Sequence, residues 1–134
     1  YDLAGPLTDV TWPRRLLRLS FGDAFNGSIE GVRWPPSLQM IFLGHSFNQP
    51  VEEVDWPASL KQLRFGDSFN QEVERVRWPG GLEQLVFGNK FNRPIVRMKE
   101  WPSSLLLLSF GYAFNQSVIG VALPPRLEVC MQDT

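Results

Sequence analysis

Cysteine is nearly absent from this chain, as are long apolar runs and any excess of charge of one sign. One cysteine, Cys130, among 134 residues excludes an internal disulfide framework, so packing and hydrogen bonds must hold the fold. No apolar run approaches the roughly 18 residues of a membrane span. The formal net charge of −1 gives no reason to expect a nucleic acid or an anionic membrane as partner.

A signal peptide is also lacking, and the chain opens on Tyr1 rather than on methionine, so processing from a longer precursor stays open. The single cysteine is compatible with a reducing compartment. Together these two features favour a cytoplasmic location.

One motif is present many times. Tryptophan recurs every 22 residues and then once more after 23 residues, at Trp12, Trp34, Trp56, Trp78 and Trp101. A glycine and a Phe-Asn pair keep step with it through the five units. A fixed period in the low twenties predicts a solenoid, in which each unit buries apolar surface only against its neighbours.

The whole chain, residues 1–134, is predicted to be one repeat array. Its predicted parts are a partial or capping repeat at 1–9, full repeats at 10–31, 32–53, 54–75, 76–97 and 98–120, and a partial repeat at 121–134. The fifth full repeat carries one extra residue within 98–101, most simply a bulge. The partial repeats depart from the motif, as terminal repeats usually do, at Leu3, Ala4, Gln132 and Asp133.

Each unit contains two short apolar triplets, as in Val73-x-x-Val76-x-Trp78 and Leu82-x-x-Leu85-x-Phe87. Apolar residues two positions apart lie on one side of an extended strand, so each triplet predicts a strand of three or four residues. Pro57 and Gly66 mark where such strands end. The predicted fold is a β-rich, right-handed solenoid with two short parallel strands per 22-residue coil and little or no helix.

Like positions of successive repeats are expected to stack into apolar columns. One column contains Leu19, Ile41, Leu63, Leu85, Leu108 and Cys130. The opposite wall contains Ile29, Val51, Val73, Ile95 and Val118, with the tryptophans aligned along its end. Two further columns are mostly phenylalanine, whose burial contributes a few kcal/mol per side chain before entropy is subtracted.

A structural ladder is expected from the asparagines that follow a core phenylalanine at a corner, namely Asn26, Asn48, Asn70, Asn92 and Asn115. A buried amide there can donate to and accept from the backbone of the adjacent coil. Asn26 and Asn115 also begin glycosylation sequons, but an asparagine that faces the corner interior cannot carry a sugar. The structural role is therefore favoured over a ligand or glycan role.

These residues closely resemble the FNIP repeat, a 22-residue branch of the leucine-rich-repeat group. Residues 34–51 read W-P-x-S-L-x-x-I-x-L-G-x-x-F-N-x-P-V, and residues 91–95 resemble the Phe-Asn-Ile-Pro core for which the family is named. The resemblance recurs in five units, with Trp before each Pro where the family usually has Leu. It implies a leucine-rich-repeat-like solenoid used for protein–protein contact, with no catalytic activity to carry over.

Catalytic residues are not expected in this chain. The only histidine, His45, occupies a corner position that holds other residue types in the other repeats, which indicates a solvated side chain rather than a metal ligand. The serines that recur before core leucines have no histidine partner, and Glu52 and Glu53 lie in an open charged row. The sequence therefore predicts no enzyme, no cofactor and no metal site.

That charged row is expected on the outward face of the first strand of each coil. Its members alternate in sign between neighbouring coils: Arg33, Asp55, Arg77 and Glu100. Opposite charges on adjacent strands support the register by about a few tenths of a kcal/mol each. A basic group near one end is interpreted as solvated rather than as an anion site: Arg14, Arg15, Arg18 and Arg33.

The outward positions of the second strand vary between repeats and place apolar side chains among Gln and Arg, which is typical of an interaction site. We predict a protein partner bound at Met40, Phe42, Gln62, Arg64, Gln84, Val86 and Leu107, with Phe42 as the main hot spot. Val129 and Met131 are assigned to the same face. The alternatives are that this face covers another domain or a second copy, that the array binds cell-surface carbohydrate, or that it is a spacer in a larger protein.

Overall fold

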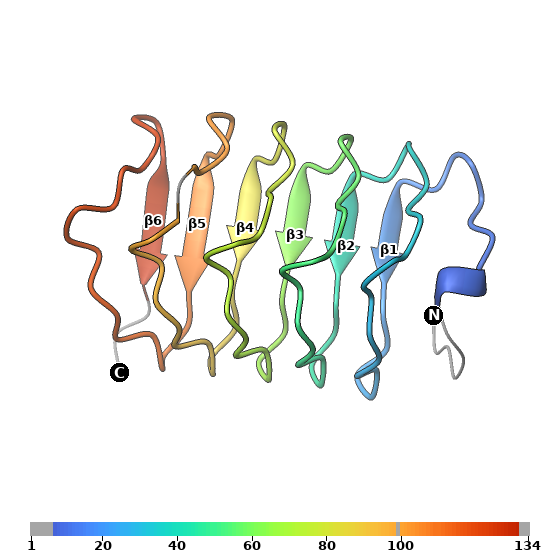
Figure 1. Cartoon of the computed structure of the whole chain (residues 1–134), viewed down its shortest axis with the longest axis horizontal. Helices are drawn as coiled ribbons and strands as arrows, with labels where there is room; N and C mark the ends of the chain where they lie inside the picture. Colours follow the sequence, from blue (N-terminus) through green and yellow to red (C-terminus); the bar gives the residue numbers. More distant parts are fainter. Residues whose placement is uncertain (1–6, 99, 132–134) are drawn as a thin grey trace.

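The computed structural model describes residues 7–98 and 100–131 and shows the chain wound into stacked coils (Figure 1). A short 3₁₀ helix and six strands follow one another: η1 (Leu7–Asp9), β1 (Arg18–Ser20), β2 (Met40–Phe42), β3 (Gln62–Arg64), β4 (Gln84–Val86), β5 (Leu107–Phe110) and β6 (Glu128–Met131). The strands form one parallel sheet in chain order. The predicted β-solenoid is confirmed, and the described residues contain no α-helix.

Within residues 7–98 and 100–131 each coil has one strand, so the prediction of two strands per coil is wrong. The expected additional strand falls in stretches such as Val73–Trp78, where two turns leave no room for a ladder. The amide of Val76 donates to the carbonyl of Val73 at 3.1 Å, and the amide of Leu82 donates to the carbonyl of Pro79 at 3.1 Å. Only two residues lie between these turns, and proline has no N–H to add to a ladder.

The one strand in each coil forms directly after such a turn, because its first amides donate hydrogen bonds to the neighbouring coil. The amides of Glu83 and Gln84 donate to the carbonyl of Lys61 at 2.8 and 3.0 Å. The pairing follows the sequence period, since Leu63 on β3 lies beside Leu85 on β4. Both leucines are fully buried. A slipped register would turn them to solvent, so the buried column holds the strands in place.

Glycine closes the corner after each strand because there is no space for a side chain. A Cβ on Gly66 or Gly88 would lie 2.0 or 2.3 Å from the carbonyl oxygen of the glycine one coil earlier. Within this column only Gly44 has a left-handed backbone, with φ of 86°. Close contact between successive main chains is therefore the main reason for the glycine column.

Aromatic rings stack from coil to coil through the core. Phe69 is fully buried between Phe47 and Phe91, with ring centroids 6.1 and 6.0 Å away and nearly parallel planes. Trp34 and Trp56 stack in the same way at 6.1 Å on the far wall. Offset stacking of this kind adds to the stabilisation that burial alone provides.

Trp78 departs from the tryptophan column. Its ring meets Phe87 edge-on, at 6.5 Å and an interplanar angle of 77°, and its indole N–H donates to Met98 Sδ at 3.2 Å. Met98 opens the repeat in which the period lengthens from 22 to 23 residues. The prediction of an aligned tryptophan edge therefore fails at the fourth coil. Lys99, within the predicted bulge, lies outside the described residues.

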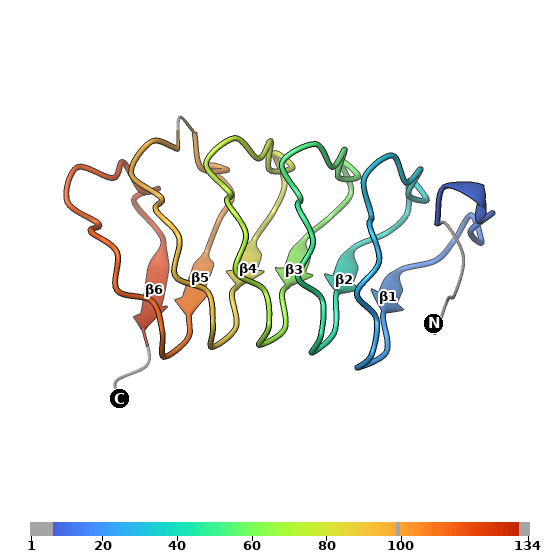
Figure 2. The ribbon, with the colours of Figure 1, turned by 60° about the horizontal axis from the view of Figure 1, so that its bottom comes forward.

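The array is curved, with the sheet on its concave side. Between successive coils the ring centroids are 5.4 Å apart at Phe65 and Phe87, directly after the strands, and 6.1 Å apart at Trp34 and Trp56. Parallel strands lie about 4.8 Å apart. The spacing therefore grows with distance from the sheet, and the coils fan out on the opposite side (Figure 1, Figure 2).

The last coil departs from the sequence period. Val129 on β6, rather than Cys130, pairs with the buried Leu108 on β5, and Cys130 pairs with Ser109. The predictions that Cys130 lies in the core column and that Val129 and Met131 point outward are therefore wrong. A shift of one residue exchanges the two faces of a strand, and this shift turns the branched aliphatic side chain toward the core.

The end of the array is less buried than its middle. All four residues of β6 are exposed, and Val118, predicted in the buried wall, is 39% exposed. The expected departures from the motif at 3–4 and 132–133 lie outside the described residues. No helix within 7–98 or 100–131 has the length and apolar character needed to cross a membrane.

Candidate functional site

The seven side chains predicted to bind a partner lie in two rows across the concave face of the sheet. Pairing of β2 to β5 gives a first row of Met40, Gln62, Gln84 and Leu107. It gives a second row of Phe42, Arg64, Val86 and Ser109. The central residue of each of these strands is buried, which directs the flanking side chains outward.

These rows form a shallow surface of mixed character. Phe42 and Val86 are half-buried, whereas Arg64, which lies between them in the row, is exposed. Half-burial is expected on a concave face because curvature brings neighbouring side chains together. Apolar side chains set among hydrogen-bonding groups are the usual make-up of a protein–protein interface.

A groove of about 480 Å³ continues the face around the corner at which the strands end. Phe42 and Val86 line its strand side. Its corner side carries Tyr112, which is 52% exposed, and His45, whose Nδ1 lies 3.6 Å from Asp67 Oδ2. Sequence reasoning did not place Tyr112 on this surface. The signal was present, because its corner position varies between repeats.

Asparagine rungs fix the corner that carries these residues. Each side-chain Oδ1 accepts the backbone N–H of the next asparagine at 2.8 or 2.9 Å, through Asn26, Asn48, Asn70, Asn92 and Asn115 in turn. A glutamine often adds to the rung, since Gln71 Nε2 donates to Asn48 Oδ1 at 3.1 Å. The rungs pair corner amides that the bend would otherwise leave without an acceptor.

A second set of rungs was not predicted. The hydroxyls of Ser59 and Ser104 donate to the carbonyls of Leu38 and Leu82 in the preceding coil, at 2.6 and 2.7 Å. These hydroxyls therefore act as donors to main-chain carbonyls of the preceding coil. Nowhere in the described residues do three or more His, Cys, Asp or Glu side chains gather where a metal ion could bind.

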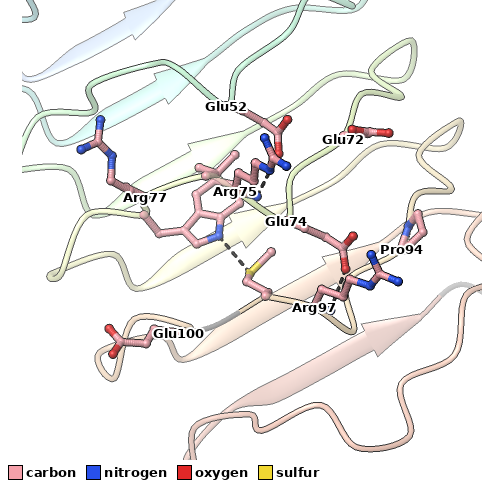
Figure 3. Close-up of a pocket in the computed structure, with 11 residues that line it drawn as sticks. Glu52, Glu72, Glu74, Arg75, Arg77, Pro94, Arg97 and Glu100 are labelled. Carbon is pink, nitrogen blue, oxygen red and sulfur yellow. Dashed lines mark hydrogen bonds between the residues drawn. The ribbon is translucent and has the colours of Figure 1, made fainter.

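A second groove, of about 950 Å³, lies on the wall opposite the sheet (Figure 3). Its charged lining consists of Glu52, Glu72, Glu74, Arg75, Arg77, Arg97 and Glu100. Trp78 also lines this groove. Glu52 Oε2 accepts the backbone N–H of Arg75 at 2.9 Å, and Glu74 Oε2 accepts that of Arg97 at 2.6 Å. Two of the carboxylates thus cap the turn of the next coil.

The charged row of alternating sign does not pair as predicted. The one ion pair found in the described part of the chain joins His45 to Asp67, so none joins Arg33, Asp55, Arg77 and Glu100. The predicted pairing needed adjacent strands about 4.8 Å apart. The described residues of this wall form no strand, and the spacing between coils is wider there, so the row is a solvated surface.

Comparison with known proteins identifies the repeat. Residues 47–76 match the FNIP Repeat family. A crystal structure of CroV588, described as a novel circular leucine-rich-repeat protein, superimposes on this chain with a TM-score of 0.68 and 33% sequence identity. The match covers 92% of this chain and 21% of that one, so this chain spans about a fifth of the CroV588 length. No curated protein matches the chain.

Proposed function

Because this chain carries the FNIP repeat in a leucine-rich-repeat-like parallel solenoid, we propose that it is a non-catalytic scaffold for protein recognition or assembly. The partner is a protein that lies across the concave face of the sheet. Its contacts are Met40, Phe42, Gln62, Arg64, Gln84, Val86 and Leu107, extended around the corner by Tyr112.

The two in-register rows are the observation that carries this proposal. Strands β2 to β5 hold the rows at fixed spacing, while the inward residues Ile41, Leu63 and Leu85 are fully buried. The outward residues range from apolar to charged along the two rows, and the inward ones are uniformly aliphatic. Such a scaffold can change what it binds without changing its core.

Phe42 is proposed as the main anchor. It is half-buried, lies beside the exposed Arg64 and opens onto the corner groove near Tyr112. Aromatic and arginine side chains are over-represented among residues that dominate binding energy. A partner segment that crosses the strands can place an apolar side chain in this groove and bond to the glutamines of the first row.

The test is capture of partner proteins by the immobilised chain, with cross-linking mass spectrometry to locate the contacts. Phe42→Glu is expected to lower capture by at least about tenfold, because it places a charge at the centre of the contact. Val96→Glu is the matched control, since Val96 is 45% exposed and lies in the sequence between Pro94 and Arg97, which line the groove on the far wall. Undiminished capture by Phe42→Glu, with unchanged thermal unfolding, would contradict the proposal.

Carbohydrate binding is a second candidate, and the groove of Figure 3 is the observation that favours it. The partly buried indole of Trp78 lies there among carboxylates and guanidinium groups, which can bond to hydroxyls. A glycan array probed with the wild-type chain and with Trp78→Ala separates the two functions. Glycan binding that depends on Trp78 would favour this candidate over protein recognition.

A further inference from the structure

We propose that the part of the partner lying on the concave face is an α-helix, a proposal that rests on the recognition role given above. The axis of this helix follows the array and crosses strands β2 to β5, so that about one turn of the helix meets each coil. Its contact stripe carries apolar residues on both sides of one carboxylate, and the carboxylate faces Arg64.

The spacing of the coils is close to the pitch of a helix. Parallel strands lie about 4.8 Å apart, and an α-helix rises about 5.4 Å per turn. In an extended segment, side chains that point to the same side lie about 6.8 Å apart. Between β2 and β5 a helix therefore departs from the coil spacing by about 2 Å and an extended segment by about 6 Å. Only the helix can keep one side chain in register with each coil.

The inner strands have no main-chain edge to offer a partner. Each of β2, β3, β4 and β5 pairs with a strand on both sides. An extended segment that binds a sheet gains much of its affinity from main-chain hydrogen bonds at an open edge. A helix pairs its own main-chain groups and binds through side chains alone. The concave face therefore favours a helix over an added strand.

The two outward rows are far enough apart to hold one helix. Gln62 and Arg64, one from each row, lie two residues apart on β3, which is a distance of about 6.7 Å. A helix with its side chains is about 10 Å across. Its axis can therefore lie between the rows, with one line of side chains directed at each row.

Arg64 indicates the charge of the partner. It is the only charged side chain in the two rows that cross β2 to β5. Its guanidinium is not in an ion pair, since the one ion pair within residues 7–98 and 100–131 joins His45 to Asp67. A guanidinium pairs with a carboxylate through two parallel hydrogen bonds. An Asp or Glu on the helix, at the turn that lies over β3, completes this contact.

The neighbours of Arg64 in its row indicate apolar residues on each side of that acid. Phe42 on β2 and Val86 on β4 are half-buried and line the corner groove. Residues three or four positions apart lie on the same face of a helix, one turn from each other. The stripe that fits the row is therefore apolar, acidic and apolar, at intervals of three or four residues.

Selection from two peptide display libraries on the immobilised chain tests this assignment. One library varies the residues on one face of a helix, and the other varies the same number of consecutive residues in a linear segment. Helical peptides with the apolar, acidic, apolar stripe are expected to dominate the enriched pool. A proline at the centre of an enriched peptide, on the face away from the contact, is expected to weaken binding at least about tenfold because it breaks the helix.

Charge exchange tests the position of the acid. Arg64→Glu is expected to weaken binding of an enriched peptide at least about tenfold, because like charges then face each other. Replacement of the acid in the peptide by lysine is expected to recover this loss. Arg33→Glu, at an exposed arginine in the charged row on the opposite wall, is the matched control and should leave the affinity unchanged. Equal losses in the two variants, or no recovery by the lysine peptide, would overturn the proposal.

Phe42→Glu distinguishes failure of the helix from failure of the recognition role. Enriched linear peptides that bind the wild-type chain and not Phe42→Glu would overturn the helix and retain recognition at this face. Peptides that bind both chains equally, or no enrichment from either library, would overturn both. Self-association of the wild-type chain that Phe42→Glu abolishes, measured by sedimentation equilibrium, would assign the face to a second copy and overturn the helix.

Discussion

The coil of Phe69 and the coil of Phe114 share one motif and have different surroundings. Phe69 is fully buried, with a ring stacked on each side of it along the array. Phe114 stacks on Phe91 of the preceding coil at 6.0 Å and is only half-buried. The motif therefore determines the path of a coil, whereas burial depends on having a neighbour on both sides.

This contrast has an energetic consequence. The stability of a repeat array is approximately the sum of intrinsic terms for each coil and of interface terms between neighbours. A substitution in a central coil disturbs two interfaces, and the same substitution in the last coil disturbs one. Matched pairs of variants can therefore test the contrast, with urea unfolding for the whole array and hydrogen exchange for single coils.

Removal of a stacked ring is expected to have the largest effect. Phe69→Ala should lower the free energy of unfolding by about 4 kcal/mol, because it leaves a cavity between two fixed rings. Phe114→Ala should cost only about 1 kcal/mol, because solvent already reaches that site and the end of the array can relax. Equal costs in urea unfolding would show that the last coil is as well packed as the centre.

Adding a methyl group to a glycine of the corner column is expected to have the second-largest effect on stability. Gly88→Ala should destabilise the chain by about 3 kcal/mol, since its Cβ would lie 2.3 Å from the carbonyl oxygen of Gly66 and the coils would have to separate. Gly120→Ala is the control, because nothing lies within 4 Å of its Cβ. It should cost about 1 kcal/mol, from its left-handed φ of 81° alone. Thermal unfolding of both variants decides whether close contact matters more than backbone conformation.

Loss of a rung is expected to have an intermediate effect. Asn70→Ala should cost about 2 kcal/mol, because it leaves the backbone N–H of Asn92 without the acceptor that it has at 2.9 Å. Asn115→Ala, in the exposed last rung, should cost less than about 0.5 kcal/mol.

Asn70→Asp separates the hydrogen bond from the shape of the side chain, because it keeps the accepting oxygen. It should retain more of the stability than Asn70→Ala does. Faster amide exchange at Asn92 in Asn70→Ala, with no change in Asn70→Asp, is the expected pattern. Unchanged exchange at Asn92 in both variants would show that the rung does not hold this corner.

Much of the fold could be predicted because the same pattern of residues recurs in every repeat. The column that includes Leu63 and Leu85 follows from the 22-residue period, and the same period places Phe42 and Arg64 side by side on the sheet. Each repeat supports the register of the next. The rows on the concave face were therefore accessible from sequence, although what they bind is not encoded in the spacing.

The other features of the fold could not be predicted because the same local apolar spacing occurs both in strands and in turns. Stretches such as Val73–Trp78 have the spacing of a strand, yet Val73–Val76 forms a turn and only two residues separate it from the next turn. The groove of Figure 3 depends on side chains from four successive repeats, one of which is lengthened, so no single unit reveals it. The shift at β6 is hidden in the sequence, where Cys130 keeps the 22-residue spacing from Leu108 although Val129 is the residue that pairs with it.

The smallest expected effect tests that shift. Cys130 is exposed and pairs with Ser109, so Cys130→Ser should change the free energy of unfolding by less than about 0.5 kcal/mol. A position in the buried column would give a larger cost, because a hydroxyl would lose water without gaining a partner. Leu108→Ser, in the coil before, is the matched core substitution and should cost several-fold more. A clear loss of stability in Cys130→Ser would place the thiol in the core column and restore the 22-residue period at the end of the array.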